Sequence, residues 1–584
     1  MRTTFSLLLV LFLQQRVAVS AVEVPDRLSQ ECLKEKYTRL SCSKVFCPPW
    51  RHCINGKCVC KLPYQCPRLG RAVCGLNGQT YISFCQAQAI ACRTNTAVFS
   101  HYDFCGEDIF KVELKKSGDR DVVQMETVKG KALICGAKSW DIAAANVICR
   151  SLKAEARGAA SAQKMTVKDL EVGHQWPSQC MSVSCTGSEY SLAECTIYEP
   201  QDVEEDTQIA AFTCYKKPQD DDECPEFRCV NEKCILWKHT CDGIDHCGDN
   251  SDEMCCNECQ SGAFHCKAGV CIPGQAVRDG IRDCLGGDDE VPTAAVGPAE
   301  TEPVWRSPKN DILQIRNYTE SQLECGIPNL DYVHRTNADS RRKRMVGGQE
   351  ALPWQFQWQA ALKEAYSFRC GGVYLGGCWV LTAAHCVNQA NPESLRVMLS
   401  LWNMHSPLTT TDTIPVKNII IHKDYNPRTY QNDIALVQLQ ELMGSKECLH
   451  PNPAVRPVCV PWSTLQFQDG DTCTISGWGK SREGGRSKIL KWTNVTITGN
   501  CKNYYKERFF DGMECAGDVD SCHGESGGPL VCKDASGLSY VWGIVSWGEK
   551  CGEDSFPGVY TKVAHYFEWI RIHTGRPAVT KYNH

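Results

Sequence analysis

Three short sequences in this chain hold residues that could together carry out nucleophilic chemistry. They are LTAAHC at 381–386, NDIAL at 432–436 and GESGGPL at 524–530, which contain His385, Asp433 and Ser526. A serine hydroxyl is a poor nucleophile at neutral pH, so a histidine has to accept its proton during attack and return it to the leaving amine. An aspartate bonded to the imidazole holds the correct tautomer and stabilises its cation. Each sequence alone also has a purely structural interpretation, but the three together predict an activated serine.

In the order His, Asp, Ser, these sequences resemble the trypsin/chymotrypsin family of serine proteases, and the resemblance covers residues 345–584. It implies that His385, Asp433 and Ser526 are catalytic, and that the backbone N–H groups of Gly524 and Ser526 form an oxyanion hole. Short apolar runs between Gly-rich turns agree with it, as does an amphipathic stretch at 563–572. We therefore expect an all-β double barrel with a terminal helix.

The same resemblance implies a specificity pocket. Asp520 lies six residues before Ser526, where trypsin-like members place the acid at the base of the pocket. A buried carboxylate there needs a cationic partner, so the substrate is expected to present Arg or Lys. The resemblance assigns the pocket walls to Ser546, Gly548 and Gly558. A surface role for Asp520 is the alternative, and the two glycines argue against it.

A run of four basic residues, RRKR at 341–344, directly precedes Met345. By resemblance it is a proprotein-convertase site, and cleavage after Arg344 would free an N-terminus that inserts and ion-pairs with Glu525. Two residues depart from the family's pattern, because the first residue is usually Ile or Val and the acid is usually Asp. One hypothesis is that the longer Glu and the adaptable Met compensate for each other. The other is that the isolated protease is weak and is completed by its substrate complex.

The composition restricts the class of protein. The chain has 584 residues, of which 40 are cysteine, with a net charge of −5 and 42% hydrophobic residues. So many cysteines, in an even number, indicate an oxidising compartment and argue against a cytosolic enzyme. The hydrophobic content excludes a wholly disordered chain, and the charge gives no support for nucleic-acid binding. The length predicts several domains.

The N-terminal 20 residues resemble a secretory signal peptide, because Arg2 is followed by a short apolar run and then by small residues. That run is too short to span a bilayer, which takes about 20 residues, and no later segment suggests a membrane anchor. Sequons at Asn317 and Asn494 agree with an exported glycoprotein. We therefore expect a secreted, extracellular protein of plasma.

Cysteine density divides the chain before the protease domain into small disulfide-stapled modules. Residues 32–106 resemble a follistatin-like module with a Kazal-like unit. Kazal-like units can inhibit proteases, but we favour a role for this one as a spacer or docking surface. Residues 109–215 resemble a scavenger-receptor cysteine-rich domain, a type that usually binds proteins. Residues 224–256 and 259–293 resemble LDL-receptor class A repeats, here called repeat 1 and repeat 2. Residues 294–344 are expected to form a linker that includes the basic cleavage site.

LDL-receptor class A repeats normally hold calcium with four carboxylates and two backbone carbonyls, which suit a hard cation. Repeat 2 keeps all four acids but has Arg278 and Thr293 in place of one cysteine pair, so we expect it to depend more on calcium than repeat 1. Its acids could instead be a solvated face. In repeat 1, His246 stands where an acid is expected and Asp245 lies one place early, which leaves calcium there open. The ligands implied by resemblance are Ala276, Asp279, Ile281, Asp283, Asp289 and Glu290 in repeat 2, and His239, Asp242, Ile244, Asp252 and Glu253 in repeat 1.

The pairing of the cysteines follows partly from these resemblances and partly from parity. Family spacing leaves Cys32 and Cys255 without partners, so we hypothesise that they bond each other. Cys325 precedes the cleavage site, and a bond to Cys459 would tether a heavy chain to a light chain after cleavage. The remaining bridges implied by resemblance are Cys149–Cys214, Cys185–Cys195, Cys370–Cys386, Cys473–Cys532, Cys501–Cys515 and Cys522–Cys551.

The order of the modules is similar to that of a family of complement-regulating plasma proteases. The similarity implies cleavage of C3b and C4b after arginine, with the help of cofactor proteins such as factor H and without an organic cofactor. The alternatives are another modular trypsin-like protease and a weak or inactive protease-like binding scaffold. The intact His385, Asp433 and Ser526 argue against the scaffold, whereas Met345 and Glu525 keep it open.

Overall fold

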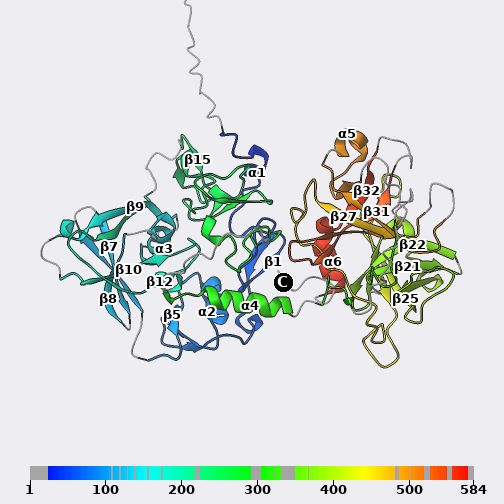
Figure 1. Ribbon diagram of the computed structural model, residues 1–584, viewed down its shortest axis with the longest axis horizontal. Coiled ribbons are helices and arrows are strands. Elements are labelled where there is room, and N and C mark those ends of the chain that lie inside the picture. The colour runs from blue at the N-terminus through cyan, green and yellow to red at the C-terminus, as the bar shows by residue number, and fades with distance from the viewer. Residues whose placement is uncertain are drawn as a thin grey trace, which may run out of the picture.

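The computed structural model describes residues 24–575 apart from 107–109, 118–119, 128, 137–139, 154–156, 172–174, 217–223, 291–303, 322–323, 331–348, 366, 480–485, 500, 518–525 and 549–555. Small modules from the N-terminal part of the chain lie beside a larger β-rich domain from its C-terminal part (Figure 1). The chain is therefore a multidomain, disulfide-rich protein, as the sequence predicts.

A closed antiparallel barrel forms the first half of the C-terminal domain, with the strand order β21–β22–β23–β26–β25–β24. Paired side chains such as Val380 and Val437, both fully buried, fill its interior. The strands are β21 (Gln359–Glu364), β22 (Ser367–Gly376), β23 (Trp379–Thr382), β24 (Leu395–Leu399), β25 (Asp412–Ile421) and β26 (Ala435–Leu439).

A seven-stranded sheet with the order β20–β28–β27–β30–β31–β32–β29 forms the second half. Its strands are β20 (Gln349–Glu350), β27 (Thr472–Gly477), β28 (Lys491–Thr496), β29 (Met513–Ala516), β30 (Pro529–Lys533), β31 (Ser539–Trp547) and β32 (Gly558–Lys562). The short helix α5 (Cys501–Tyr505) precedes β29, and the expected terminal helix is α6 (Phe567–Thr574). Glu568 in the first turn of α6 and Arg571 in its last turn complement the helix dipole.

The scavenger-receptor-like region is built on a second seven-stranded sheet, in which β6 pairs with β7 beside the path β13–β10–β8–β7–β14–β9. The helix α3 (Ile142–Lys153) buries Ala144, Ala145 and Ile148 and contacts β9 and β14. The strands are β6 (Lys111–Ser117), β7 (Arg120–Thr127), β8 (Gly130–Ile134), β9 (Ala159–Thr166), β10 (Gln179–Met181), β13 (Gln201–Asp202) and β14 (Gln208–Cys214).

The other modules have little regular structure, as expected for small domains held by disulfides. The first contains α1 (Gln30–Lys34), β1 (Arg51–Ile54), β2 (Lys57–Cys60), β3 (Val73–Gly75), β4 (Thr80–Tyr81), α2 (Phe84–Thr94) and β5 (Phe99–Tyr102). Each LDL-receptor-like repeat has one hairpin: β15 (Phe227–Arg228) with β16 (Cys234–Ile235), and β17 (Phe264–Cys266) with β18 (Val270–Ile272).

The segment expected to be a linker contains regular structure that docks on the first two modules. Strand β19 (Val304–Arg306) pairs with β12 (Thr196–Tyr198), which also pairs with β11 (Val183–Ser184). The buried Arg306 guanidinium lies 4.6 Å from the ring centroid of Phe99 and donates to the carbonyl of Ser100 at 2.7 Å. Helix α4 (Lys309–Ser321) follows and buries Ile315. These buried contacts attach the segment despite its polar composition.

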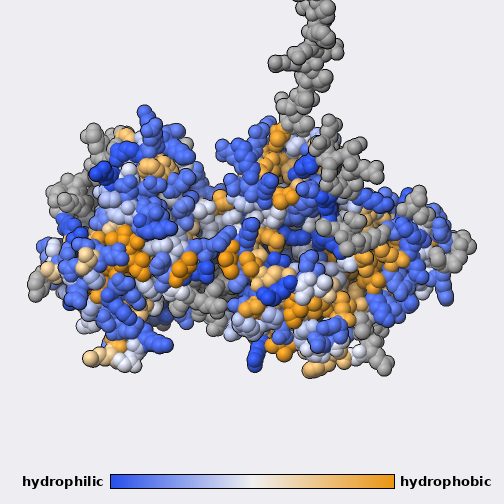
Figure 2. All heavy atoms as spheres, turned by 180° about the vertical axis from the view of Figure 1, so that it is seen from behind, coloured by the Kyte–Doolittle hydropathy of each residue, from blue (hydrophilic) through white to orange (hydrophobic). Residues whose placement is uncertain are grey.

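The first module also contacts the protease domain directly. The hydroxyl of Ser463 donates to the carbonyl of Ser43 at 2.6 Å, and the rings of Phe46 and Trp462 lie 5.7 Å apart. On the face opposite to that of Figure 1, hydrophobic residues form several patches that hydrophilic residues interrupt (Figure 2). None of the helices in the described part of the chain has the length and hydrophobicity that a membrane span requires.

Candidate active site

His385 and Asp433 are brought together by two neighbouring strands of the closed barrel. His385 lies in a 3₁₀ turn just after β23, and Asp433 lies just before β26. Because Thr382 of β23 pairs with Ala435 of β26, the two side chains meet at one end of the barrel. The His385 Nδ1 atom lies 2.7 Å from Asp433 Oδ2, and the His385 backbone N–H donates to Asp433 Oδ1 at 3.0 Å. A carboxylate only accepts, so this contact places the ring proton on Nδ1 and leaves Nε2 to act as a base.

The Asp433 side chain is fully buried, one further donor bonds it, and two more hold the backbone and the residue next to it. The Ser546 hydroxyl, expected in a pocket wall, donates to Asp433 Oδ2 at 2.5 Å, and the Thr561 hydroxyl donates to the Asp433 carbonyl at 2.8 Å. The Tyr566 hydroxyl donates to Asn432 Oδ1 at 2.8 Å. Burial, assisted by the charge of Asp433, raises the pKa of Tyr566, so this phenol stays protonated as a donor. Sequence reasoning placed Ser546 in a pocket wall but did not predict its bond to Asp433, and it missed Thr561 and Tyr566. All three lie more than 100 residues along the chain from the residue they bond, and no local pattern marks these bonds.

Ser526 is exposed on the turn that leads into β30, and this turn packs against the barrel that carries His385. The Ser526 carbonyl accepts from the N–H of Gly371 at 2.9 Å. Gly527 has φ +77°, and a Cβ atom there would lie 2.3 Å from Thr382 Oγ1, so only glycine fits at this position. Among the described residues, no hydrogen bond joins the Ser526 hydroxyl to His385. Such catalytic hydrogen bonds are often long in free enzymes and tighten when substrate binds.

The two glycines predicted for the pocket walls lie at the ends of adjacent strands. Gly548 follows β31 and Gly558 begins β32, and these strands pair at Trp547 and Val559. Among the described residues, which exclude the neighbouring 549–555, nothing lies within 4 Å of a Cβ atom built at Gly548. Seven other predicted residues lie outside the described residues: Arg344, Met345, Asp520, Cys522, Gly524, Glu525 and Cys551.

The structure joins most of the cysteines that the sequence pairs. Cys32 bonds Cys255, and Cys325 bonds Cys459. The backbone next to the first bond is also paired, because the N–H of Ser29 donates to the carbonyl of Cys255 at 3.0 Å. The other predicted bonds within the described residues are Cys149–Cys214, Cys185–Cys195, Cys370–Cys386, Cys473–Cys532 and Cys501–Cys515.

The four predicted acids of repeat 2 are joined by backbone hydrogen bonds, and one of them, Asp279, also pairs with Lys309 at 2.5 Å. One carboxylate oxygen of Asp289 accepts from the backbone N–H of Asp283, and one of Glu290 accepts from the backbone N–H of Gly280. Their other oxygens, Asp289 Oδ1 and Glu290 Oε1, are buried and have no hydrogen-bond partner in the described part of the chain. Burial raises the pKa of Asp283 to about 7 and that of Asp289 to about 6. Buried carboxylate oxygens without partners are what a bound cation would satisfy.

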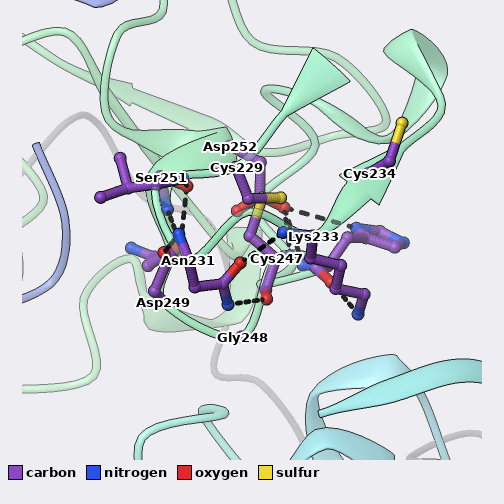
Figure 3. The surroundings of a disulfide bond; sticks show 12 residues. Cys229, Asn231, Lys233, Cys234, Cys247, Gly248, Asp249, Ser251 and Asp252 are labelled. Atoms are coloured by element: carbon purple, nitrogen blue, oxygen red, sulfur yellow. Dashed lines mark hydrogen bonds and ion pairs between the residues drawn. A yellow bond between two sulfur atoms is a disulfide. The ribbon is translucent and has the colours of Figure 1, made fainter. Parts of the chain in front are cut away.

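In repeat 1, the predicted cage has three acids, Asp242, Asp252 and Glu253, and His246 stands at the position of the fourth. Asp252 is fully buried and lies beside the Cys229–Cys247 disulfide (Figure 3). Asp245 points away from the cage, because its carboxylate accepts from the N–H groups of Gly248 and Asn250 and pairs with Arg39 at 3.3 Å. Asp245 therefore does not replace the missing fourth acid. Burial raises the pKa of Glu253 to about 9.

The described sites can be compared with known proteins. Five family models match parts of the chain. The trypsin model matches residues 345–570, the scavenger receptor cysteine-rich domain 116–215, and the low-density lipoprotein receptor domain class A 257–293. The complement factor I FIMAC N-terminal domain matches 38–58, and the complement factor I Kazal domain matches 60–105. A solved structure of mouse neuropsin, a serine protease, is 34% identical and covers 39% of this chain and all of its own, with a TM-score of 0.35.

Similarity to whole proteins extends over nearly the entire chain. Complement factor I of Mus musculus is 39% identical over 99% of this chain and 98% of its own, and that of Rattus norvegicus is 39% identical over 96% and 95%. Coagulation factor XII of Sus scrofa is 40% identical over 40% of each chain. The trypsin domain makes the protein a serine endopeptidase. With this identity over both full lengths and the same set of domains, the chain belongs to the complement factor I family.

Proposed function

We propose that this protein is a secreted, two-chain protease that cleaves C3b and C4b after arginine, with the help of cofactor proteins such as factor H, and so down-regulates complement. The observation that carries this proposal is the buried Asp433, bonded to both His385 and Ser546, next to the turn of Ser526. A charged aspartate kept fully buried and hydrogen-bonded is costly unless it orients another group. The family membership supports the choice of complement proteins as substrates.

In the proposed mechanism, His385 Nε2 takes the proton of Ser526 as its hydroxyl attacks the scissile carbonyl. Asp433 holds the ring in place and stabilises the imidazolium cation, which then protonates the leaving amine. The backbone N–H groups of Gly524 and Ser526 bind the oxygen that becomes negative, and one such donor is typically worth about 3–4 kcal/mol in the transition state. A water molecule then attacks the acyl-enzyme by the same steps, with His385 again taking the proton, and releases the acyl group.

Specificity for arginine would come from Asp520 at the base of a pocket with Gly548 and Gly558 in its walls. No described residue fills the position of a Cβ atom at Gly548, which supports room for a long side chain there. A guanidinium can bind a carboxylate with two parallel hydrogen bonds, which favours Arg over Lys.

Activation would follow cleavage after Arg344. The new N-terminus at Met345 would pair with Glu525, and the Cys325–Cys459 bond would keep the two chains together. Because both Met345 and Glu525 depart from the usual family residues, we propose that the free protease is weak and that its substrate complex completes the site. Calcium in repeat 2, held by the side chains of Asp279, Asp283, Asp289 and Glu290 and the carbonyls of Ala276 and Ile281, would stabilise the modules that dock partners.

One experiment tests these proposals. The wild-type protein and its Ser526→Ala variant are incubated with C3b plus factor H, with C3b alone, and with a small arginine ester. We expect wild type alone to cut C3b, and only with factor H, and to hydrolyse the ester slowly. Cutting of neither substrate would support a binding scaffold. Rapid ester hydrolysis without a cofactor would support an ordinary trypsin-like enzyme.

The pocket assignment needs its own variant. Asp520→Ser should lose activity on the arginine ester and on C3b, while labelling of Ser526 by a small fluorophosphonate continues. Equal activity of the variant on arginine substrates would place specificity elsewhere.

A further inference from the structure

Repeats 1 and 2 build their cation cages on the same backbone hydrogen bonds. In repeat 1 the N–H of His246 donates to Asp252 Oδ2 at 2.7 Å, and in repeat 2 the N–H of Asp283 donates to Asp289 Oδ2 at 2.7 Å. Two more bonds correspond in the same way. The N–H of Gly243 donates to Glu253 in repeat 1, as that of Gly280 does to Glu290 in repeat 2. The N–H of Ile244 donates to Asp242, as that of Ile281 does to Asp279. The two cages therefore share these three hydrogen bonds at corresponding positions, so the side chains at equivalent positions can be compared directly.

Two positions of the shared cage carry imidazole rings in repeat 1 only. His246 stands where repeat 2 has Asp283, and His239, at the end of a 3₁₀ turn, stands where repeat 2 has Ala276. The rings of His239 and His246 are stacked, with centroids 4.2 Å apart. The ligand atoms of His239, Asp242 and His246 all lie within 4.8 Å of one another. Repeat 1 thus gathers two nitrogen donors and a carboxylate at one point.

Asp252 gives an independent sign that this point faces a missing partner. Its side chain is fully buried, and its Oδ1 atom has no hydrogen-bond partner in the part of the chain that the structure describes. Its other oxygen accepts from the backbone N–H groups of His246 and Cys247 and lies 3.9 Å from His246 Nδ1. That ring nitrogen lies 3.5 Å from Asp242 Oδ1 and 2.9 Å from the carbonyl oxygen of Ile244, so binding an ion there would replace the contact with Ile244. The side chains of His246 and Asp242 keep 14% and 9% of their surface exposed, so an ion can reach them from solvent.

The repeat 1 cage offers fewer carboxylate oxygens than a hard cation needs. The buried ammonium of Lys233 donates to the carbonyl of His246 at 2.6 Å and so fixes the backbone of this position, without favouring one divalent cation over another. Asp245 is held by Arg39 instead of joining the cage. Calcium takes six to eight oxygen ligands, whereas zinc is normally held by four ligands and accepts imidazole nitrogen together with carboxylate oxygen.

We propose that repeat 1 binds Zn²⁺ through His239, Asp242, His246 and Asp252, while repeat 2 keeps the oxygen cage that suits Ca²⁺. A borderline cation prefers imidazole donors, and a hard cation prefers oxygen donors. The two repeats would then hold different metals on one backbone design. Asp242 and Asp252 supply the negative charge that balances the ion, and the two neutral imidazoles supply the selectivity.

The test uses the full secreted protein, stripped of metal and then saturated with Ca²⁺. Zn²⁺ is titrated by calorimetry, and Co²⁺ is added separately as a probe, because imidazole-bound Co²⁺ in a four-coordinate site absorbs visible light. We expect one equivalent of Zn²⁺ to bind in excess Ca²⁺, with the Co²⁺ bands appearing over the same stoichiometry. No Zn²⁺ binding in excess Ca²⁺, or displacement of Zn²⁺ by Ca²⁺ at comparable concentrations, would overturn the proposal.

Three variants assign the site. His246→Gln and His239→Gln should each weaken Zn²⁺ binding by at least about 100-fold, since even outer-shell partners of a metal typically contribute about 10- to 100-fold. His246→Asp should restore the fourth acid and let a second Ca²⁺ bind at the expense of Zn²⁺. The matched control His405→Gln removes an exposed histidine of the protease domain and should bind Zn²⁺ as wild type does. Unchanged Zn²⁺ affinity in both the His239 and His246 variants would refute the assignment.

Discussion

Removing calcium from repeat 2 should make its stability depend on pH. Without a cation, burial raises the pKa of Asp283 from 3.8 to about 7, mainly because the carboxylate loses its hydration. The folded pKa then lies above the unfolded value, so the folded repeat holds this proton more tightly than the unfolded chain does. The stability of the metal-free repeat therefore falls as pH rises from about 4 to about 7.

The size of the effect follows from the same shift. Each pKa unit corresponds to about 1.4 kcal/mol, so ionising Asp283 in the metal-free fold costs about 4 kcal/mol. Repeat 2 has two disulfides within the described residues, Cys259–Cys271 and Cys266–Cys284, and it also packs against the protease domain, where Lys267 pairs with Asp471 at 2.9 Å. A bound Ca²⁺ would supply the positive charge that the ionised carboxylates lack, and would cancel the loss.

Hydrogen exchange gives a local readout in this multidomain chain. The N–H groups of Gly280, Ile281 and Asp283 donate to cage carboxylates and report on the cage itself. After correction for intrinsic exchange rates, their protection in metal-free protein should fall between pH 5 and pH 7.5, and Ca²⁺ should restore it. Asp283→Asn should remove the pH dependence, and amides of β26 serve as an internal control. Equal protection at both pH values without metal would refute the reasoning.

Three further outcomes are expected. Ser546→Ala removes a donor to the buried Asp433. Because a hydrogen bond to a charged group is worth about 1.5–3 kcal/mol, kcat on a small arginine ester should fall about 10- to 100-fold with KM nearly unchanged. An unchanged kcat would contradict this role. Replacing Cys32 and Cys255 together by serine should speed exchange in α1 without altering ester turnover, and identical exchange would count against the bond as a restraint. N-glycosidase treatment should release a glycan from the exposed Asn494, and intact mass before and after treatment decides it.

Local sequence was enough to predict the three catalytic motifs, because their chemistry requires particular residue types in particular contexts. The fold class of the C-terminal domain was predicted from the same residues, and it is confirmed. Counting cysteines led to the pair Cys32 and Cys255, which the structure joins although they lie 223 residues apart. Parity works here because two modules each leave one cysteine over, and a secreted chain seldom keeps a free thiol.

Other features had no local signature. The polar composition of 294–344 predicted a linker, but one arginine, Arg306, is buried between aromatic rings and docks the segment on the modules. Whether an arginine is exposed or buried depends on the surface that meets it, and the sequence around it does not contain that surface.

The sequence by itself determined the residue types on which the proposals rest: the serine, histidine and aspartate of the protease, the acids of repeat 2 and the histidines of repeat 1. Only the tertiary structure decided which of them share a site and how each is supported. It placed Ser546 on Asp433, turned Asp245 toward Arg39, and stacked His239 on His246. The physical reason is that a side chain's covalent identity sets what it can donate or accept, whereas burial and long-range packing set which partner it meets.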